Sequence, residues 1–209
     1  MARARAVIVW TALFLVIAIP IAAAAFSPLL AWRQPIYIAA GLSGIAAFAL
    51  LVLQPLLATG ALPGLNGLRG RSVHRWVGAA LVATVCFHVG GLWITSPPDV
   101  VDALLFASPT PFSAWGVIAM WAVFASALLA VLRRKLRPRI WRVIHLVLAV
   151  LIAGGTIIHA VLIEGTMEPA TKLLLCAVVA LATTKAVLET KVWSRGRARA
   201  RRQTPGPSN

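Results

Sequence analysis

Six apolar runs, each long enough to cross a lipid bilayer, alternate with short polar segments along the chain. The hydrocarbon core of a bilayer is about 30 Å thick, which a helix spans with about 20 apolar residues. Segments rich in proline, glycine and charge separate the runs. The pattern predicts an all-α integral membrane protein, a bundle of six transmembrane helices. The predicted helices lie near residues 6–26, 36–58, 74–95, 112–132, 140–163 and 169–189.

The first apolar run has two interpretations. Arg3 and Arg5 precede it and it ends in the alanines from Ala22 to Ala25, as in a secretory signal peptide. Its apolar part approaches about 20 residues, whereas a signal peptide has about 7–15. The length favours a retained helix. Cleavage of residues 1–25 stays open, and the topology of the rest of the chain is the same in both cases.

The basic residues predict how the helices are oriented. The chain has a net charge of +15, and 18 of its 20 lysines and arginines lie at alternate ends of the predicted helices. Basic connections face the cytoplasm, so we expect a multi-pass protein of the inner membrane with both termini cytoplasmic. The clusters are topology signals next to lipid and do not indicate nucleic-acid binding. The basic segments are the N-terminus, residues 58–75, residues 133–142 and the chain from Lys185 onward.

The chain divides into a membrane domain, residues 1–192, and a basic tail, residues 193–209. The tail contains five arginines followed by a segment of proline, glycine and polar residues. We expect it to be disordered, cytoplasmic and in contact with anionic lipid headgroups, each basic residue contributing about 1 kcal/mol near the surface.

Four histidines, the only ones in the chain, form two equally spaced pairs. His74 and His88 lie in the third run, and His145 and His159 lie in the fifth. A spacing of 14 residues returns to within about 40° of the same helix face and covers roughly 21 Å along the axis. The predicted orientation puts His74 and His145 near the inner edge of the membrane and His88 and His159 in its outer half.

This arrangement favours two stacked heme sites, one for each pair of histidines at equal depth. Ionisable residues inside membrane helices are costly and are usually functional. Neutral imidazole is a common metal ligand, and helix bundles build cofactor sites from facing side chains. Two ligands per site are too few for zinc, which takes three or four. Small or short residues one turn from the histidines would leave room for a macrocycle, although they also serve helix packing. They are Gly78, Thr84, Ala149 and Gly155.

Arginines near the inner pair have two interpretations. Arg71, Arg75 and Arg142, together with Arg69, are placed to bind heme propionates through charge-assisted hydrogen bonds. They are equally placed to act as anchors at the cytoplasmic surface of the membrane.

The equal spacing of the two histidine pairs, on the third and fifth of six helices, resembles the transmembrane domain of ferric reductases and NADPH oxidases, over roughly residues 36–190. The resemblance implies two b-type hemes that pass electrons singly across the membrane. It implies His74 and His145 as axial ligands of the inner heme, and His88 and His159 as those of the outer heme.

The larger members of that family continue into a module that binds FAD and NAD(P)H, and this sequence contains no GxGxxG signature for one. We therefore expect an oxidoreductase component without catalytic residues of its own. Its electron donor is then either a separate cytoplasmic flavin reductase, which would carry the FAD, or membrane quinol, in which case this chain would bind a quinone. Its acceptor is a ferric chelate, oxygen or a periplasmic redox protein.

Two alternatives stay open. The chain is similar in size and plan to the heme membrane subunit of a periplasmic methionine sulfoxide reductase system, whose inner site departs from the full bis-histidine pattern. The presence of His74 favours the two-heme interpretation instead. For a histidine-dependent transporter or proton channel, we would expect acidic residues or broken helices near mid-membrane. All five acidic residues lie at helix ends or in connections.

Overall fold

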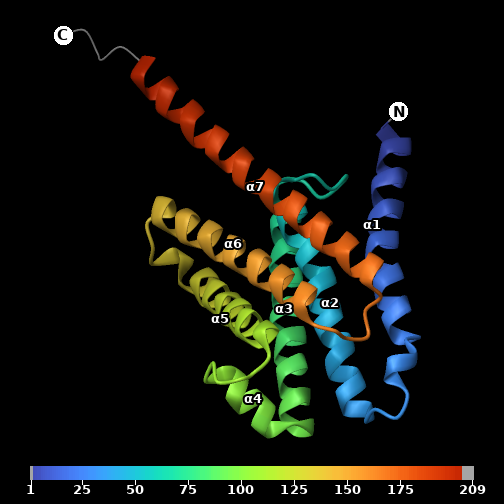
Figure 1. The fold of residues 1–209 in the computed structure, drawn as a ribbon. Helices are drawn as coiled ribbons and strands as arrows, with labels where there is room; N and C mark the ends of the chain where they lie inside the picture. The colour runs from blue at the N-terminus through green and yellow to red at the C-terminus, as the bar shows by residue number, and fades with distance from the viewer. Residues whose placement is uncertain (1, 204–209) are drawn as a thin grey trace, which may run out of the picture.

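The computed structural model describes residues 2–203, with side chains as far as Thr190. It is all-helical, and six helices are long and apolar enough to cross a membrane, which confirms the predicted fold class (Figure 1). Short 3-10 turns at Pro28–Leu30 and Leu132–Arg134 adjoin α1 and α5. The six helices are α1 Ala2–Ala25, α2 Pro35–Ala58, α3 Gly67–Thr95, α5 Pro111–Val131, α6 Pro138–Leu162 and α7 Pro169–Gln203.

Two boundaries differ from the sequence expectation. Helix α3 begins at Gly67 and not near residue 74, because its first two turns are polar and extend beyond the apolar run. A short helix, α4, covers Pro97–Leu104 within the predicted connection 96–111. Proline in its first turn and Asp99 beside the free N–H groups favour a helix start there.

Proline begins four of the long helices, because its fixed φ suits the first helical position and its missing N–H is not needed there. At the start of α7 a carboxylate also caps the free backbone N–H groups. Glu168 accepts hydrogen bonds from the backbone N–H of Ala170 at 2.9 Å and of Thr171 at 2.8 Å. These bonds hold the pKa of Glu168 below its ordinary value. The four prolines are Pro35, Pro111, Pro138 and Pro169.

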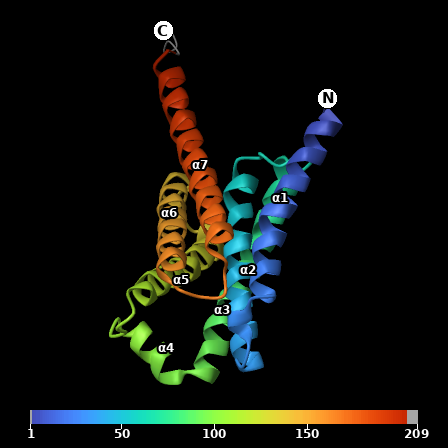
Figure 2. The same ribbon diagram turned by 45° about the vertical axis from the view of Figure 1, so that its right-hand side comes forward.

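The helices are arranged as two closely packed pairs with two further helices beside them. Helix α2 packs along α3, and α5 packs along α6. Helix α7 lies against both α6 and α2, and α1 lies at the edge against α2 and α7 (Figures 1 and 2). The backbones of α3 and α6, which carry the histidines, scarcely meet within the described residues. The site is therefore formed between two helix pairs.

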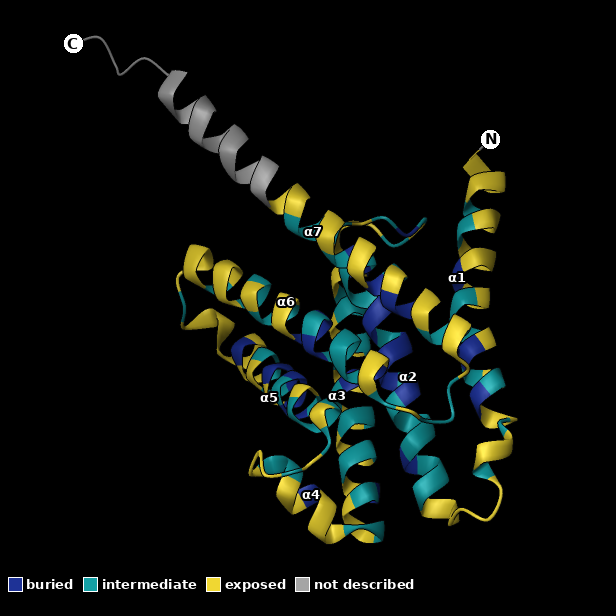
Figure 3. Ribbon diagram, in the orientation of Figure 1, coloured by how far each residue is buried: buried dark blue, intermediate teal, exposed yellow. Residues whose placement is uncertain are grey.

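The apolar core lies where α7 packs against the two helix pairs. Val52, Leu175 and Val179 are fully buried there, with Phe48 and Leu51 nearly so. Large apolar side chains on the outer surface of the bundle are exposed, most clearly along α1 (Figure 3). Exposed apolar surface around a bundle fits a lipid environment, since lipid does not penalise it. Residues 204–209 lie outside the described residues, as do the side chains of 191–203, so the predicted basic tail stays a prediction.

Candidate functional site

The inner pair of histidines meets across the gap between the two helix pairs. The ring centres of His74 on α3 and His145 on α6 are 6.3 Å apart, with the ring planes at 72°. An imidazole nitrogen binds a first-row metal ion at about 2.0–2.1 Å, so two axial histidines on one ion have ring centres roughly 6 Å apart. The separation of His74 and His145 therefore fits axial ligation of one heme iron from opposite sides.

His145 is held by two neighbours that the sequence did not suggest. The indole of Trp141, one turn earlier on α6, stacks on its ring at 5.1 Å and 10°. Trp141 itself is anchored, since its Nε1–H donates to the carbonyl of Leu129 at 3.2 Å. The hydroxyl of Ser126 on α5 lies 3.2 Å from His145 Nδ1. Neither Trp141 nor Ser126 is among the site residues that the sequence predicts.

His74 is less completely held. Its Nδ1 is buried and has no hydrogen-bond partner within the described part of the chain. The side chain of Gln54 on α2 contacts the same residue, since its Nε2 donates to the backbone carbonyl of His74 at 3.4 Å. A buried polar atom without a partner calls for an explanation.

The outer histidines share one geometry. His88 Nδ1 lies 2.8 Å from the carbonyl oxygen of Ala40 on α2, and His159 Nδ1 lies 2.8 Å from that of Phe112 on α5. A carbonyl only accepts, so each Nδ1 carries the proton and donates. Each Nε2 is then left with its lone pair, the state in which histidine binds a metal. The ring of Phe112 also meets His159 edge to face at 5.7 Å.

A glycine lies under each outer ring. A Cβ added at Gly44 would come 2.8 Å from His88 Nδ1, and one at Gly116 would come 2.7 Å from His159 Nδ1. Ordinary contact begins at 3.4 Å. The glycines thus let each imidazole lie directly on the neighbouring helix, where it can reach the backbone carbonyl.

Two of the small residues one turn from the histidines lie against neighbouring helices. Gly155 faces α5, where an added Cβ would meet the carbonyl of Trp115 at 3.1 Å. Gly78 faces α2, where it would meet Gln54 at 3.4 Å. Both allow close helix approach, because the face one turn from a histidine also turns toward the paired helix. Of the two roles that the sequence left open for these glycines, these contacts support helix packing. Thr84 hydrogen-bonds to its own helix at the carbonyls of Ala80 and Leu81.

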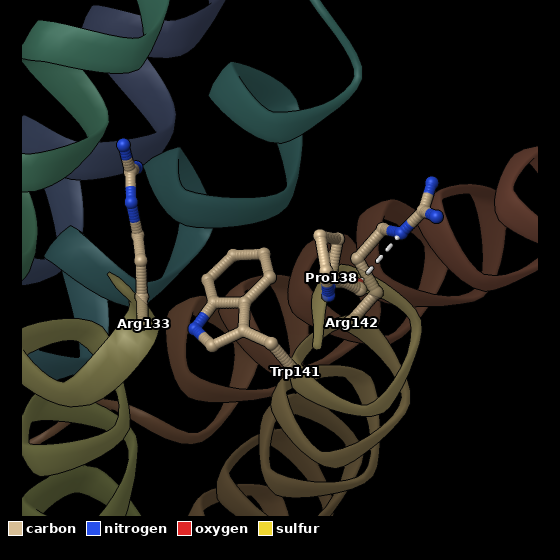
Figure 4. A pocket seen from close by; sticks show the side chains of 4 residues that line it. All are labelled: Arg133, Pro138, Trp141 and Arg142. Atoms are coloured by element: carbon tan, nitrogen blue, oxygen red, sulfur yellow. Dashed lines mark hydrogen bonds between the residues drawn. The ribbon is translucent and has the colours of Figure 1, made fainter. Parts of the chain in front are cut away.

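The four arginines predicted to bind propionates, Arg69, Arg71, Arg75 and Arg142, are exposed, and Arg142 lines a pocket. Arg71 and Arg75 lie on α3 within one turn of His74. An open pocket of about 480 Å³ is lined by Arg133, Pro138, Trp141 and Arg142 (Figure 4). Arg142 Nε donates to the carbonyl of Pro138 at 3.1 Å. The guanidinium groups of Arg133 and Arg142 extend on either side of the Trp141 indole, which makes this surface beside the inner pair positive.

The donor set suits a cofactor that brings most of its own metal ligands. The part of the chain that the structure describes has no group of three or more His, Cys, Asp or Glu able to hold a metal ion. Sites with two histidines fit heme, because the porphyrin supplies the other four ligands. The proton positions at the outer pair and the spacing of the inner pair fit the same group.

A comparison with protein families agrees with this chemistry. The profile described as a ferric reductase-like transmembrane component matches residues 43–156. The matched segment holds His74, His88 and His145 and ends just before His159. No curated protein and no solved structure matches the chain.

Proposed function

The chain belongs to the family of ferric reductase-like transmembrane components, and on that premise we propose that it is a di-heme b electron-transfer protein. The family implies membrane electron transfer with heme. His74 and His145 would hold the inner heme, and His88 and His159 the outer heme.

The observation that carries this proposal is the state of the four histidines. The inner rings stand at the separation expected of two axial ligands on one iron. Both outer rings are oriented by backbone carbonyls that accept from Nδ1 and so direct the Nε2 lone pair to a metal. A proton channel would give no reason for the same proton position at both outer histidines.

Bound heme would supply a one-electron iron couple, while the protein sets ligation, orientation and local electrostatics. Trp141, stacked on His145, covers that ring on the side of the positive pocket. Phe112 covers His159 at the other end of α6.

The basic clusters support a direction for the electrons. They favour a cytoplasmic location for the end of the bundle that carries His74, His145 and the positive pocket. A cytoplasmic flavin reductase or membrane quinol would then deliver electrons at the inner pair. A ferric chelate, oxygen or a periplasmic redox protein would accept them at the outer pair.

The test is a reduced-minus-oxidised spectrum of the purified protein with pyridine hemochrome quantitation. We expect two hemes b per chain, falling to one in His88→Ala. Cys86→Ala is the matched control, since Cys86 is exposed two residues earlier on the same helix and should retain both hemes. Absence of b-type absorbance in the unmodified protein refutes the proposal. One heme per chain would instead favour the heme subunit of a methionine sulfoxide reductase system.

A further inference from the structure

The contacts that hold the histidines in α2–α3 recur in α5–α6. In each pair, one carbonyl accepts from the outer histidine and a glycine one turn later lies under its ring. The spacing along the chain recurs as well, since the outer histidine follows its carbonyl partner by 48 residues in the first pair and by 47 residues in the second. The corresponding residues are Ala40 and Phe112, Gly44 and Gly116, and His88 and His159.

The same correspondence extends to two polar residues at the level of the inner histidines. Gln54 on α2 and Ser126 on α5 follow their respective carbonyl residues by the same interval, which is also the interval between the two histidines of one helix. Ser126 contacts His145 Nδ1 at 3.2 Å. Gln54 therefore occupies the place from which a side chain would reach His74 Nδ1.

Gln54 already lies against this part of α3. Its amide nitrogen is 3.4 Å from the backbone oxygen of His74 and is within contact distance of a Cβ built at Gly78. The amide also carries an oxygen that accepts hydrogen bonds. The terminal torsion of glutamine is broad and roughly two-fold, so a flip of the amide by about 180° about that torsion places the oxygen where the nitrogen now lies. The buried Nδ1 of His74 is the atom in this region without a partner among the described residues.

We propose that Gln54 is the positioning residue of His74, its amide oxygen accepting from Nδ1–H when His74 binds the inner heme, as the Ser126 hydroxyl would accept from Nδ1–H of His145. The inference rests on the proposed heme ligation. The bond would fix the proton on Nδ1 and leave the Nε2 lone pair for the iron, as the backbone carbonyls do for the outer histidines.

A consequence follows for the two sites. The outer histidines donate to backbone carbonyls, which substitution of a side chain does not remove. The inner histidines would donate to side chains, so substitutions can tune the inner heme separately. A stronger acceptor makes the ligating imidazole more electron-rich and stabilises the oxidised iron, which lowers the midpoint potential.

The test is a spectroscopic redox titration of the purified holoprotein and its Gln54 variants. The inner heme is identified as the one lost in His145→Ala. We expect Gln54→Leu to raise the midpoint potential of the inner heme and the isosteric Gln54→Glu, with its stronger acceptor, to lower it. The outer heme should keep its potential in both variants. Thr59→Val is the control at the C-terminal end of the same helix: among the described residues the Thr59 hydroxyl bonds to the carbonyls of Pro55 and Leu56, so its loss should leave both potentials unchanged.

Opposite shifts confined to the inner heme support the proposal, since a packing defect would not change sign between leucine and glutamate. Unchanged potentials, or shifts in one direction in both variants, overturn it. If Gln54→Leu fails to accumulate, Gln54→Glu decides alone: a lowered inner potential supports the proposal and an unchanged one refutes it. Failure of heme ligation itself would appear earlier, as unmodified protein without b-type heme.

Discussion

Replacing Gly44 with alanine should dislodge the ring of His88. The added Cβ would lie 2.8 Å from Nδ1 and 2.9 Å from Cε1, whereas ordinary contact begins at 3.4 Å. The ring or the helix must therefore move by about 0.6 Å. The hydrogen bond from Nδ1 to Ala40 is 2.8 Å long. A shift of that size away from α2 stretches the bond beyond the usual limit of about 3.2 Å.

A lost buried hydrogen bond costs about 1–3 kcal/mol. At about 1.4 kcal/mol per tenfold change in an equilibrium constant, this weakens retention of the outer heme by roughly 5- to 150-fold. The same reasoning applies to Gly116→Ala, whose Cβ would lie 2.7 Å from His159 Nδ1. Gly41→Ala is the matched control, because a Cβ there meets no described atom within 4 Å.

The assay is heme content per chain by pyridine hemochrome, followed during dilution into detergent with apomyoglobin as heme acceptor. Gly44→Ala and Gly116→Ala should lose one heme of two, faster than the unmodified protein, while Gly41→Ala retains both. Wild-type retention in both variants, or equal loss in Gly41→Ala, would refute the view that the rings are held against these glycines.

Three further predictions concern the inner site, the start of α7 and the cofactor as a whole. Trp141→Phe should retain the inner heme because it keeps a ring stacked on His145. Trp141→Ala should weaken heme retention by roughly 2- to 13-fold, the equivalent of about 0.5–1.5 kcal/mol for a lost ring contact. The heme-transfer assay measures both variants, and equal retention in the two would contradict the role of stacking. The depressed pKa of Glu168 means that its ionised form stabilises the folded state above the ordinary carboxyl pKa of about 4.3 and that this contribution is lost as pH falls through the lower folded value. The midpoint temperature of thermal unfolding in detergent should therefore fall less steeply between pH 5 and roughly pH 3 in Glu168→Gln than in the unmodified protein. Parallel pH profiles of the two midpoint temperatures would count against the hydrogen bonds from Glu168 to the start of α7. Protein expressed without heme supply should unfold at a lower temperature than the heme-loaded protein, because a ligand bound only to the folded state stabilises it; identical melting curves would argue against heme bound between the helix pairs.

Much of the fold could be read from the hydrophobic pattern. The bilayer fixes the length of an apolar helix, so six runs predict six spans, and the structure confirms them. The extra turns of α3 from Gly67 to His74 and the short helix α4 lie outside that constraint. They are polar or interfacial, and local capping and packing decide their conformation. The orientation of the bundle in the membrane stays a prediction from the basic clusters.

The site was predicted less completely than the fold. Spacing along one helix correctly places His74 and His88 on nearly the same face, and the family resemblance drawn from that spacing is confirmed by the match over residues 43–156. Spacing alone does not say which neighbouring helix that face meets. The sequence therefore left two roles open for Gly78 and Gly155, room for heme and helix packing, and only the structure shows that they lie against α2 and α5.

The sequence by itself determined that this is a six-helix membrane protein with four histidines on two helices at matching depths, because bilayer thickness and helix geometry act on local patterns. Only the tertiary structure decided what holds each histidine. The hydrogen-bond partners lie 19 to 48 residues away on the paired helices α2 and α5. Two of them are backbone carbonyls, which every residue carries, so no residue type marks them. Their role comes from the packing of α2 on α3 and of α5 on α6, where a glycine lets an imidazole reach the neighbouring backbone.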